Sequence, residues 1–403
     1  MDVATGRSLM SDLTDFLRAM APETLCHGFL QELRGSAAEP ARVFCLGKAA
    51  PGLALAASRI WPGLPGLVYG TTPPGDIPER YEALFGSHPI PTEANVQRTR
   101  EVRRWLSEGS GPLLAVVSGG GSSLLVAPRE PWTLDEKAAL TASLLNAGAS
   151  VRELNVVRAR LSQVKAGGLL RHVRPWPVTT LIWSDVGPRD GRLVAGGPTV
   201  PWRRTVPAEA VLCKYALELR KPLPPLAPKP RMAEGDLAQV LCDAAAVRRA
   251  YARHLRTMGF AVKEILVPEG LGVEALSETF VRAFMGWPGR RPRALVGAGE
   301  ATVKAKASGR GGRCSHLAAA VAKRMLKARS SRRWLFAAVA TDGVDGGAGA
   351  GAWTDWEVVP CERELGEALE SCDTGTLWEK AGTLAPRNPS GNNLRDVWVL
   401  VGE

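Results

Sequence analysis

Short apolar segments alternate with longer helical patterns along almost the whole chain. In the first half, runs rich in Val, Leu and aromatic residues are separated by segments whose apolar residues recur every three or four positions. This alternation predicts an α/β fold, with a largely parallel sheet and helices on its faces. The expected strands are Arg42–Gly47, Gly66–Thr72, Tyr81–Gly86, Leu113–Ser118 and Val178–Asp185, and the expected helices include Thr92–Glu108, Leu134–Ala147 and Arg152–Val173.

A proline-rich segment divides the chain. Lys221–Pro230 holds five prolines in ten residues, which excludes helix and central strand and favours a stiff extended connector. A chain of 403 residues also exceeds one typical core. We therefore expect an N-terminal domain at residues 1–220, a connector at 221–235 and a C-terminal α/β domain at 236–403. The second domain is expected to contain helices Asp236–Met258, Val273–Phe284 and Ser315–Lys327, and strands Ala261–Val267, Arg293–Gly299, Trp334–Thr341 and Asp396–Val401.

The composition of the chain excludes several classes of protein. The net charge of +11 is spread along the chain without an aromatic-and-basic recognition module, so we expect no nucleic-acid partner but a bias toward anionic small substrates. The seven cysteines form neither a Cys-x-x-Cys pair nor a zinc-type spacing. No signal-peptide pattern or membrane-spanning apolar run is present, and we expect a cytoplasmic protein with no membrane partner.

A glycine-rich loop follows the strand predicted at Leu113–Ser118. The residues Ser118, Gly119, Gly120, Gly121 and Ser122 combine glycines, which let bare backbone N–H groups approach a ligand, with flanking hydroxyls. This composition suits a phosphate or carboxylate. The same composition also fits an ordinary tight turn.

Cationic and amide side chains recur near the expected strand ends and on one helical pattern. Lys48 follows the first strand, and His88 precedes a proline-fixed loop. Asn155, Arg158, Ser162 and Lys165 are spaced to share one face of the helix expected at Arg152–Val173. A set of this kind without acids is a candidate lining for an anion pocket, although a solvated helix face has a similar pattern.

Carboxylates stand at loop positions in both halves. Asp185 ends a strand and Asp190 follows it, a placement typical of a magnesium ligand or a general base, and equally of solvated loop residues. In the second half, Thr341, Asp342 and Asp345 lie among glycines after a strand, and Arg313 follows a glycine-rich loop. An anion cradle, cations and carboxylates together are what phosphoryl transfer from ATP with Mg²⁺ requires. The familiar P-loop and protein-kinase loops are absent from the sequence.

The ordered motifs resemble the glycerate 2-kinase family, whose C-terminal part is the MOFRL domain. They cover nearly the whole chain: Gly47-Lys48-Ala49-Ala50, Gly86–Pro91, Ser118–Leu125, Glu153–Arg158 with Leu161-Ser162, Ser184-Asp185-Val186, Gly197-Pro198-Thr199 and Thr341–Gly346. The resemblance implies a Rossmann-like N-terminal domain, a smaller MOFRL-type domain and a cleft between them. It also implies that ATP and Mg²⁺ phosphorylate D-glycerate to 2-phosphoglycerate, and we expect direct transfer without a covalent enzyme intermediate.

The resemblance assigns roles by position. Lys48, Asp185 and Arg313 would be catalytic, with Lys48 on the transferring phosphate or substrate carboxylate and Arg313 steadying charge from across the cleft. Asp185 and Asp190 would hold metal. Substrate and phosphate contacts would come from His88, Ser118, Gly119, Gly120, Gly121, Ser122, Asn155, Arg158, Lys165, Thr341, Asp342 and Asp345.

The sequence also departs from the family pattern. Arg189 stands where the family usually has Asp, Trp202 replaces another Asp, and Cys314–His316 replace Asn-Gln-Glu. Two alternatives therefore stand beside glycerate phosphorylation: a kinase of a different hydroxy acid or specialised metabolite, and a non-catalytic relative that binds nucleotide or glycerate. In each case the expected partners are ATP and a small hydroxy acid, with the chain a monomer or homodimer.

Overall fold

The computed structural model describes residues 6–36, 39–71, 77–186, 190–202, 206–225, 227–228, 230, 232–288, 292–303, 309–330, 332–388, 390–391 and 394–403. Arg189, one of the departures from the family pattern, lies outside these ranges, as do parts of the expected connector.

The chain forms two compact α/β units, which confirms the predicted fold class. The parallel-sheet unit comprises Pro22–Leu241, and the mixed-sheet unit comprises Met1–Ala21 with Cys242–Glu403. These bounds differ from the expected ones in two places. The N-terminal helix belongs with the C-terminal residues, and residues 221–241 belong with the first sheet.

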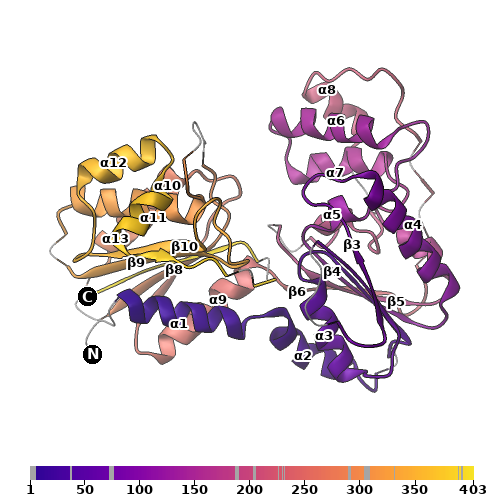
Figure 1. The fold of residues 1–403 in the computed structure, drawn as a ribbon, viewed down its shortest axis with the longest axis horizontal. Helices are drawn as coiled ribbons and strands as arrows, with labels where there is room; N and C mark the ends of the chain where they lie inside the picture. Colours follow the sequence, from indigo (N-terminus) through magenta and orange to yellow (C-terminus); the bar gives the residue numbers. More distant parts are fainter. Residues whose placement is uncertain are drawn as a thin grey trace. The chain divides into compact units, whose positions relative to one another are not determined.

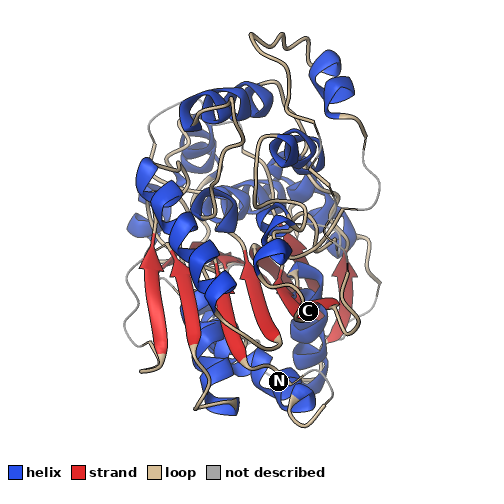
Figure 2. Cartoon of the chain, turned by 90° about the vertical axis from the view of Figure 1, so that its right-hand side faces the viewer, coloured by secondary structure: helices blue, strands red, loops and turns tan. Residues whose placement is uncertain are grey.

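The parallel-sheet unit has the strand order of a doubly wound nucleotide-binding fold. Its order is β3-β2-β1-β4-β5-β6, and each pair from β3 to β5 is parallel. Figure 2 shows strands of this sheet side by side. Strands β1, β2, β4 and β5 are buried along their whole length, as expected for a sheet covered on both faces. The strands are β1 (Arg42–Leu46), β2 (Gly66–Gly70), β3 (Tyr81–Phe85), β4 (Leu113–Ser118), β5 (Val178–Trp183) and β6 (Leu237–Cys242).

Local signals in the sequence explain several helices of this unit. Thr133 with Glu136, and Ser150 with Glu153, form capping boxes in which each side chain satisfies a free backbone N–H at a helix start. Helix α3 packs on β1, β2 and β4. The helices are α2 (Pro22–Leu33), α3 (Ala50–Ile60), α4 (Glu93–Glu108), α5 (Gly121–Leu124), α6 (Leu134–Asn146), α7 (Val151–Arg160) and α8 (Ala208–Lys214), with 3₁₀ turns η1 (Gly168–His172) and η2 (Val194–Gly196).

Two expected helices are wrong in part. The helix expected at Arg152–Val173 ends as α7 at Arg160. Ser162 then pairs with Pro128 in an isolated bridge, and Ala166 and Gly167 adopt left-handed backbone angles farther along. Of the proposed polar stripe, only Asn155 and Arg158 are therefore helical. The segment expected to begin a helix at Asp236 instead forms β6, and the helix begins after it.

The mixed-sheet unit has the order β11-β10-β9-β12-β8-β7, in which β12 runs antiparallel between β9 and β8. Figure 1 shows α10 to α13 on one side of the sheet and α1 with α9 on the other. The strands are β7 (Ala261–Ile265), β8 (Arg293–Gly299), β9 (Trp334–Ala340), β10 (Gly351–Asp355), β11 (Leu384–Ala385) and β12 (Asp396–Gly402). The helices are α1 (Gly6–Ala19), α9 (Ala244–Thr257), α10 (Val273–Met285), α11 (Arg313–Lys327), α12 (Glu362–Glu370) and α13 (Thr374–Ala381).

Polar contacts attach helix α1 to the mixed-sheet unit. Asp12 accepts a hydrogen bond from the Tyr251 hydroxyl at 3.1 Å and pairs with His254 at 2.7 Å, both on α9. The Phe16 ring packs against the Tyr251 ring at 4.8 Å between centroids. These contacts hold α1, from one end of the chain, in a unit built mostly from residues of the other end.

Among the described residues, no helix combines the length and the apolar character that crossing a membrane requires.

Asp236 is predicted to anchor the segment that leads into β6. Its carboxylate accepts hydrogen bonds from Arg174 at 2.6 Å, from the Val178 N–H at 2.8 Å and from the Ala233 N–H at 2.7 Å. We expect Asp236→Ala to lower the free energy of unfolding by about 3 kcal/mol, because it leaves a largely buried arginine without its partner. Asp15→Ala, which breaks an exposed ion pair with Arg18, should cost less than about 1 kcal/mol. Urea denaturation of both variants measures the difference, and equal losses would contradict the anchoring role.

Candidate active site

The strand order of the parallel sheet reverses between β1 and β4, and in such sheets ligands bind beyond the carboxyl ends of the strands at this point. The two strands run in register, with Leu46 opposite Val117. The turns that follow them are bonded together: the Lys48 N–H donates to the Gly119 carbonyl at 2.8 Å. The first-strand turn and the glycine-rich loop therefore form one structure.

Ser118 has a structural position. Its buried hydroxyl accepts a hydrogen bond from the Ala49 N–H at 3.1 Å and donates to the Leu46 carbonyl at 3.0 Å. Gly47, at φ +110°, lies so close that a Cβ there would be 2.6 Å from the Gly119 carbonyl oxygen. The hydroxyl of Ser118 thus holds the turn that presents Lys48.

Gly120 lies between Lys48 and His88. It adopts a left-handed conformation, φ +83°, and a Cβ at this position would lie 3.0 Å from Lys48 Cγ and 3.3 Å from His88 Cδ2. Three residues predicted separately from three loops therefore meet at one point. The pKa of His88 is lowered, first by partial desolvation and then by the positive charge of Lys48, which favours a neutral imidazole there.

Ser122 and Lys165 meet on another side of the same loop. Lys165 Nζ lies 3.0 Å from Ser122 Oγ and donates to the Ala195 carbonyl at 2.9 Å. Ala195 and Gly196 both have positive φ, and a Cβ on Gly196 would lie 2.9 Å from Lys165 Nζ. Because Gly196 has no Cβ, the side chain of Lys165 has room to reach the loop.

Three cations gather behind the loop without acidic partners. Lys137 and Lys165 are buried and Arg158 is half-buried, and within the described ranges no carboxylate forms an ion pair with any of them. Burial, followed by the charge of Arg158, lowers the pKa of Lys137 to about 7, and burial lowers the pKa of Arg158 to about 10. Burial, Lys137 and Arg158 also lower the pKa of Lys165 well below its usual range. A bound anion would offset this concentration of positive charge.

Sequence reasoning missed Lys137, although a signal was present. Lys137 falls on the apolar spacing of α6 together with Leu134, Leu140 and Leu144, all of them buried. A cation at a core position of a helical pattern is rarely found without a partner or a function.

Asn155 belongs to the same region. Its side-chain amide donates to the Leu193 carbonyl at 2.9 Å, while its buried Oδ1 accepts no hydrogen bond. An unsatisfied buried acceptor in a native structure is uncommon and is consistent with a missing donor, such as a ligand hydroxyl.

Asp190, one of the two expected metal ligands, is held by arginine side chains. Both Asp190 oxygens are held by Arg192, at 2.7 and 2.8 Å, and Arg152 donates to the same carboxylate at 3.0 Å. The Arg192 hydrogen bond is the main cause of the lowered pKa of Asp190. Asp185 follows β5 and is half-buried. Among the described residues, no group of three or more His, Cys, Asp or Glu side chains is placed to hold a metal ion.

Predicted residues of the mixed-sheet unit have structural partners. Asp345, which is buried, accepts hydrogen bonds from the Cys314 and Ser315 N–H groups at 2.9 and 2.8 Å and so caps α11. The Thr341 hydroxyl donates to the Arg395 carbonyl at 2.7 Å. Asp342, half-buried, accepts from the Val344 N–H at 3.1 Å. The start of α11 therefore already carries a carboxylate where an anionic ligand would bind.

Arg313 stands at the first position of α11 between acids. It pairs with Glu300 and, at 3.2 Å, with Asp396 on β12. Burial raises the pKa of Asp396 to about 7. The carboxylates hold the guanidinium in a fixed position within this unit.

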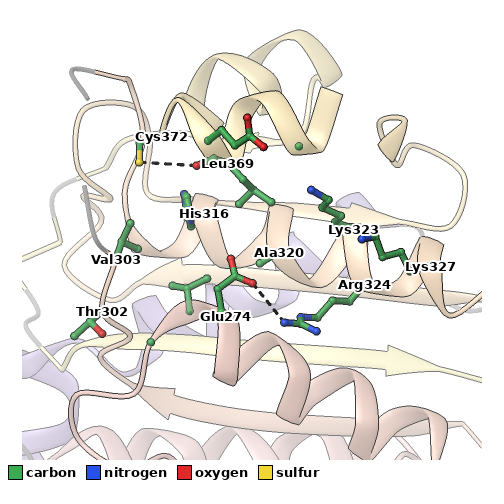
Figure 3. Close-up of a pocket in the computed structure, with 14 residues that line it drawn as sticks. Glu274, Thr302, Val303, His316, Ala320, Lys323, Arg324, Lys327, Leu369 and Cys372 are labelled. Atoms are coloured by element: carbon green, nitrogen blue, oxygen red, sulfur yellow. Dashed lines mark hydrogen bonds and ion pairs between the residues drawn. The ribbon is translucent and has the colours of Figure 1, made fainter. Parts of the chain in front are cut away.

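A pocket of about 700 Å³ lies on the mixed-sheet unit, over α11 and between α10 and α12 (Figure 3). His316, Ala320 and Lys323 line it along α11, but Arg324 pairs with Glu274 at 3.4 Å across it. Its lining includes none of the residues to which the sequence assigned a role. The parallel-sheet unit has a pocket of about 460 Å³ that includes Lys165 and Trp202.

Comparison with known proteins places this chain in a family. The protein-family model described as "Domain of unknown function (DUF4147)" matches residues 11–225, which are more than half of the chain. The family model of the MOFRL family matches residues 293–396. A protein of Thermotoga maritima named D-glycerate 2-kinase is 31% identical over 350 residues, which are 81% of this chain and 80% of that protein. The chain belongs to the glycerate 2-kinase family.

Other relatives match this glycerate 2-kinase family member over most of their length. A crystal structure of glycerate kinase from Thermotoga maritima matches with a TM-score of 0.85 and 26% identity, covering 98% of this chain and 99% of that one. A protein of Agrobacterium vitis that carries the provisional name hydroxypyruvate reductase is 32% identical over 386 residues, 88% of this chain and 86% of that protein. The family membership and the fold expected from the sequence motifs are confirmed, and the protein is a kinase of this family.

Substitutions of Asp345 test whether its carboxylate only caps α11 or also acts at a ligand site. Asp345→Ala should destabilise the protein by about 1–2 kcal/mol, because two N–H groups at the start of α11 lose their acceptor. Asp345→Asn keeps one of the two accepting oxygens and should therefore destabilise the protein less than Asp345→Ala in thermal denaturation. If Asp345→Asn folds normally but loses kinase turnover, the carboxylate acts in catalysis and not only as a cap.

Proposed function

We propose that this family member transfers the terminal phosphoryl group of ATP to the 2-hydroxyl of D-glycerate, giving 2-phosphoglycerate, at the carboxyl edge of the parallel sheet. The observation that carries the proposal is the meeting of Lys48, Gly120 and His88 where the strand order reverses. The names of the relatives support the choice of glycerate as substrate.

The charges of the site suit both substrates. D-Glycerate carries a carboxylate and ATP carries several phosphate charges, while the loop has Lys48 on one side and Lys165 on another. Phosphoryl transfer depends on positioning and on stabilising charge that spreads over the phosphoryl oxygens. The glycine backbone and the two lysine side chains supply both.

ATP is expected to bring its magnesium with it. Asp190, one of the two expected metal ligands, is already held by Arg192 and Arg152. Mg²⁺ at kinase sites is commonly bound by substrate phosphates and water with only one or two carboxylates. Of the two expected ligands, we assign that contact to Asp185, which follows β5.

The reductase name of one relative is not supported by this chain. A hydride-transferring enzyme of this strand order binds its dinucleotide at a Gly-x-Gly-x-x-Gly turn after the first strand. Here β1 is followed by Gly47-Lys48-Ala49-Ala50, in which Ala49 stands where the second glycine would let the backbone approach the pyrophosphate. A kinase is therefore the better proposal.

The proposal is tested by ATP turnover with D-glycerate, L-glycerate and larger hydroxy acids. We expect turnover with D-glycerate and a loss of about 10²–10³-fold in Lys48→Ala, because a charge at the developing negative site is removed. Lys380→Ala removes an exposed lysine at the end of α13 and should leave turnover unchanged.

Other outcomes of the same assay separate the alternatives. Turnover only with another acid would replace the substrate and keep the kinase. ATP binding without turnover on any acid would favour the non-catalytic relative. In a parallel assay, consumption of NADH with hydroxypyruvate would favour the reductase.

A further inference from the structure

Ser122 and Lys165 have the geometry of a nucleophile and its base. Their Oγ and Nζ atoms are 3.0 Å apart. Ser122 is only half-buried and can be reached by a substrate, whereas Lys165 is 4% exposed. A serine with an adjacent lysine base is one of the known arrangements for activating a hydroxyl.

The surroundings of Lys165 disfavour its ammonium form. A buried ammonium is costly, and Lys137 from α6 and Arg158 from α7 add like charges beside it, which is why its pKa is lowered. No carboxylate of the described residues raises the pKa of Lys165. The bond to the Ala195 carbonyl, at 2.9 Å, uses one N–H and fixes the direction of the amine.

We propose that Ser122 is a nucleophile that takes a phosphoryl group from ATP, with Lys165 as the base that receives the serine proton. The bond between Ser122 Oγ and the terminal phosphorus forms while the bond from that phosphorus to the bridging oxygen of ADP breaks, and ADP leaves with its electron pair. The serine proton passes to Lys165 Nζ. The 2-hydroxyl of the acceptor acid then attacks the phosphorus while the bond from that phosphorus to Ser122 Oγ breaks. Ser122 recovers its proton from Lys165, and the proton of the 2-hydroxyl passes to water as the one proton that the overall reaction releases. The donor and acceptor rest on the proposed function, and this route replaces the direct transfer expected from the sequence.

Charge balance favours a phosphoryl group over an acyl group on Ser122. An acyl ester is neutral and would leave Lys137, Arg158 and a newly protonated Lys165 without counter-charge. A phosphoserine carries up to two negative charges next to Lys165. The proton that Lys165 accepts becomes the charge that pairs with the product, so the buried cluster is most nearly neutral in the phosphorylated state.

A second serine with a basic partner shows why Ser122 is singled out. The Ser107 hydroxyl lies 3.0 Å from His172 Nδ1, but His172 Nε2 accepts a hydrogen bond from Arg103 at 3.0 Å. With Nε2 accepting, the neutral ring carries its proton on Nδ1, which donates to Ser107 and cannot take its proton. Ser107 therefore provides a matched control.

The direct test is incubation of the full chain with [γ-³²P]ATP and magnesium in the absence of any acid acceptor. We expect acid-stable label on the peptide that contains Ser122, with the label passing to D-glycerate when the acid is added. Ser122→Ala should lose the label and Ser107→Ala should keep it. Lys165→Met should slow labelling by about 10²–10⁴-fold, the range for loss of a general base. Thermal denaturation establishes that each variant is folded.

Labelling with a fluorophosphonate is a second experiment, and it does not depend on a nucleotide site. Labelling of Ser122 by both reagents supports the whole proposal. Labelling by the fluorophosphonate alone supports the Ser122–Lys165 pair and overturns ATP as its donor. Turnover of ATP and D-glycerate by an enzyme that neither reagent labels overturns the nucleophile and leaves the proposed kinase function intact.

The pH dependence of fluorophosphonate labelling distinguishes a base from a structural lysine. Lys165 faces Lys137, Arg158, the Ser122 hydroxyl and the Ala195 carbonyl. The labelling rate should rise as Lys165 loses its proton, and Arg158→Met should move that rise to higher pH, because a like charge that disfavours the ammonium is removed. A rate independent of pH from 5 to 9, in both proteins, would contradict the role of Lys165 as the base.

Discussion

The Ser118 hydroxyl joins the ends of the two central strands of the parallel sheet, and the candidate site depends on this junction. Its hydrogen bonds to Ala49 and Leu46 tie the turn after β1 to the loop after β4. Because both strands end at the same edge, the tie brings Lys48 to Gly120 and fixes the loop that carries Ser122. A glycine-rich loop without this buried contact would have many backbone conformations available to it and would hold neither residue in place.

Electrostatics give this loop its chemical character. Lys137, Arg158 and Lys165 concentrate positive charge behind it, without compensating acids among the described residues. The arrangement is unfavourable for the empty protein and favourable for a bound anion, which is the usual way in which functional sites trade stability for binding. By contrast, Arg313, Asp345 and Asp190 are already paired with partners of their own chain. The two sets of residues were similar as sequence motifs and differ only in what the fold places beside them.

Much of the fold could be predicted because it depends on local patterns. The strands at Arg42, Tyr81 and Leu113 begin where the apolar runs begin. The failures have specific causes. The helix expected through Val173 ends at Arg160, and Ser162 then pairs with Pro128, a residue of a distant segment that no local pattern of the helix signals. The helix expected from Asp236 gives way to β6, because an open sheet edge at β5 was available to pair with that segment.

The sequence by itself determined the family, the α/β class and the chemical types of the site residues, since periodicity, glycine runs and ordered motifs are properties of the chain alone. Only the tertiary structure decided which of those residues act together. Ser122 and Lys165 are hydrogen-bonded although separated by 43 positions, and Lys137 reaches the same cluster from another helix. Proximity of this kind, and the burial that changes the charge of a lysine, arise from packing between distant segments, which no local pattern in the chain encodes.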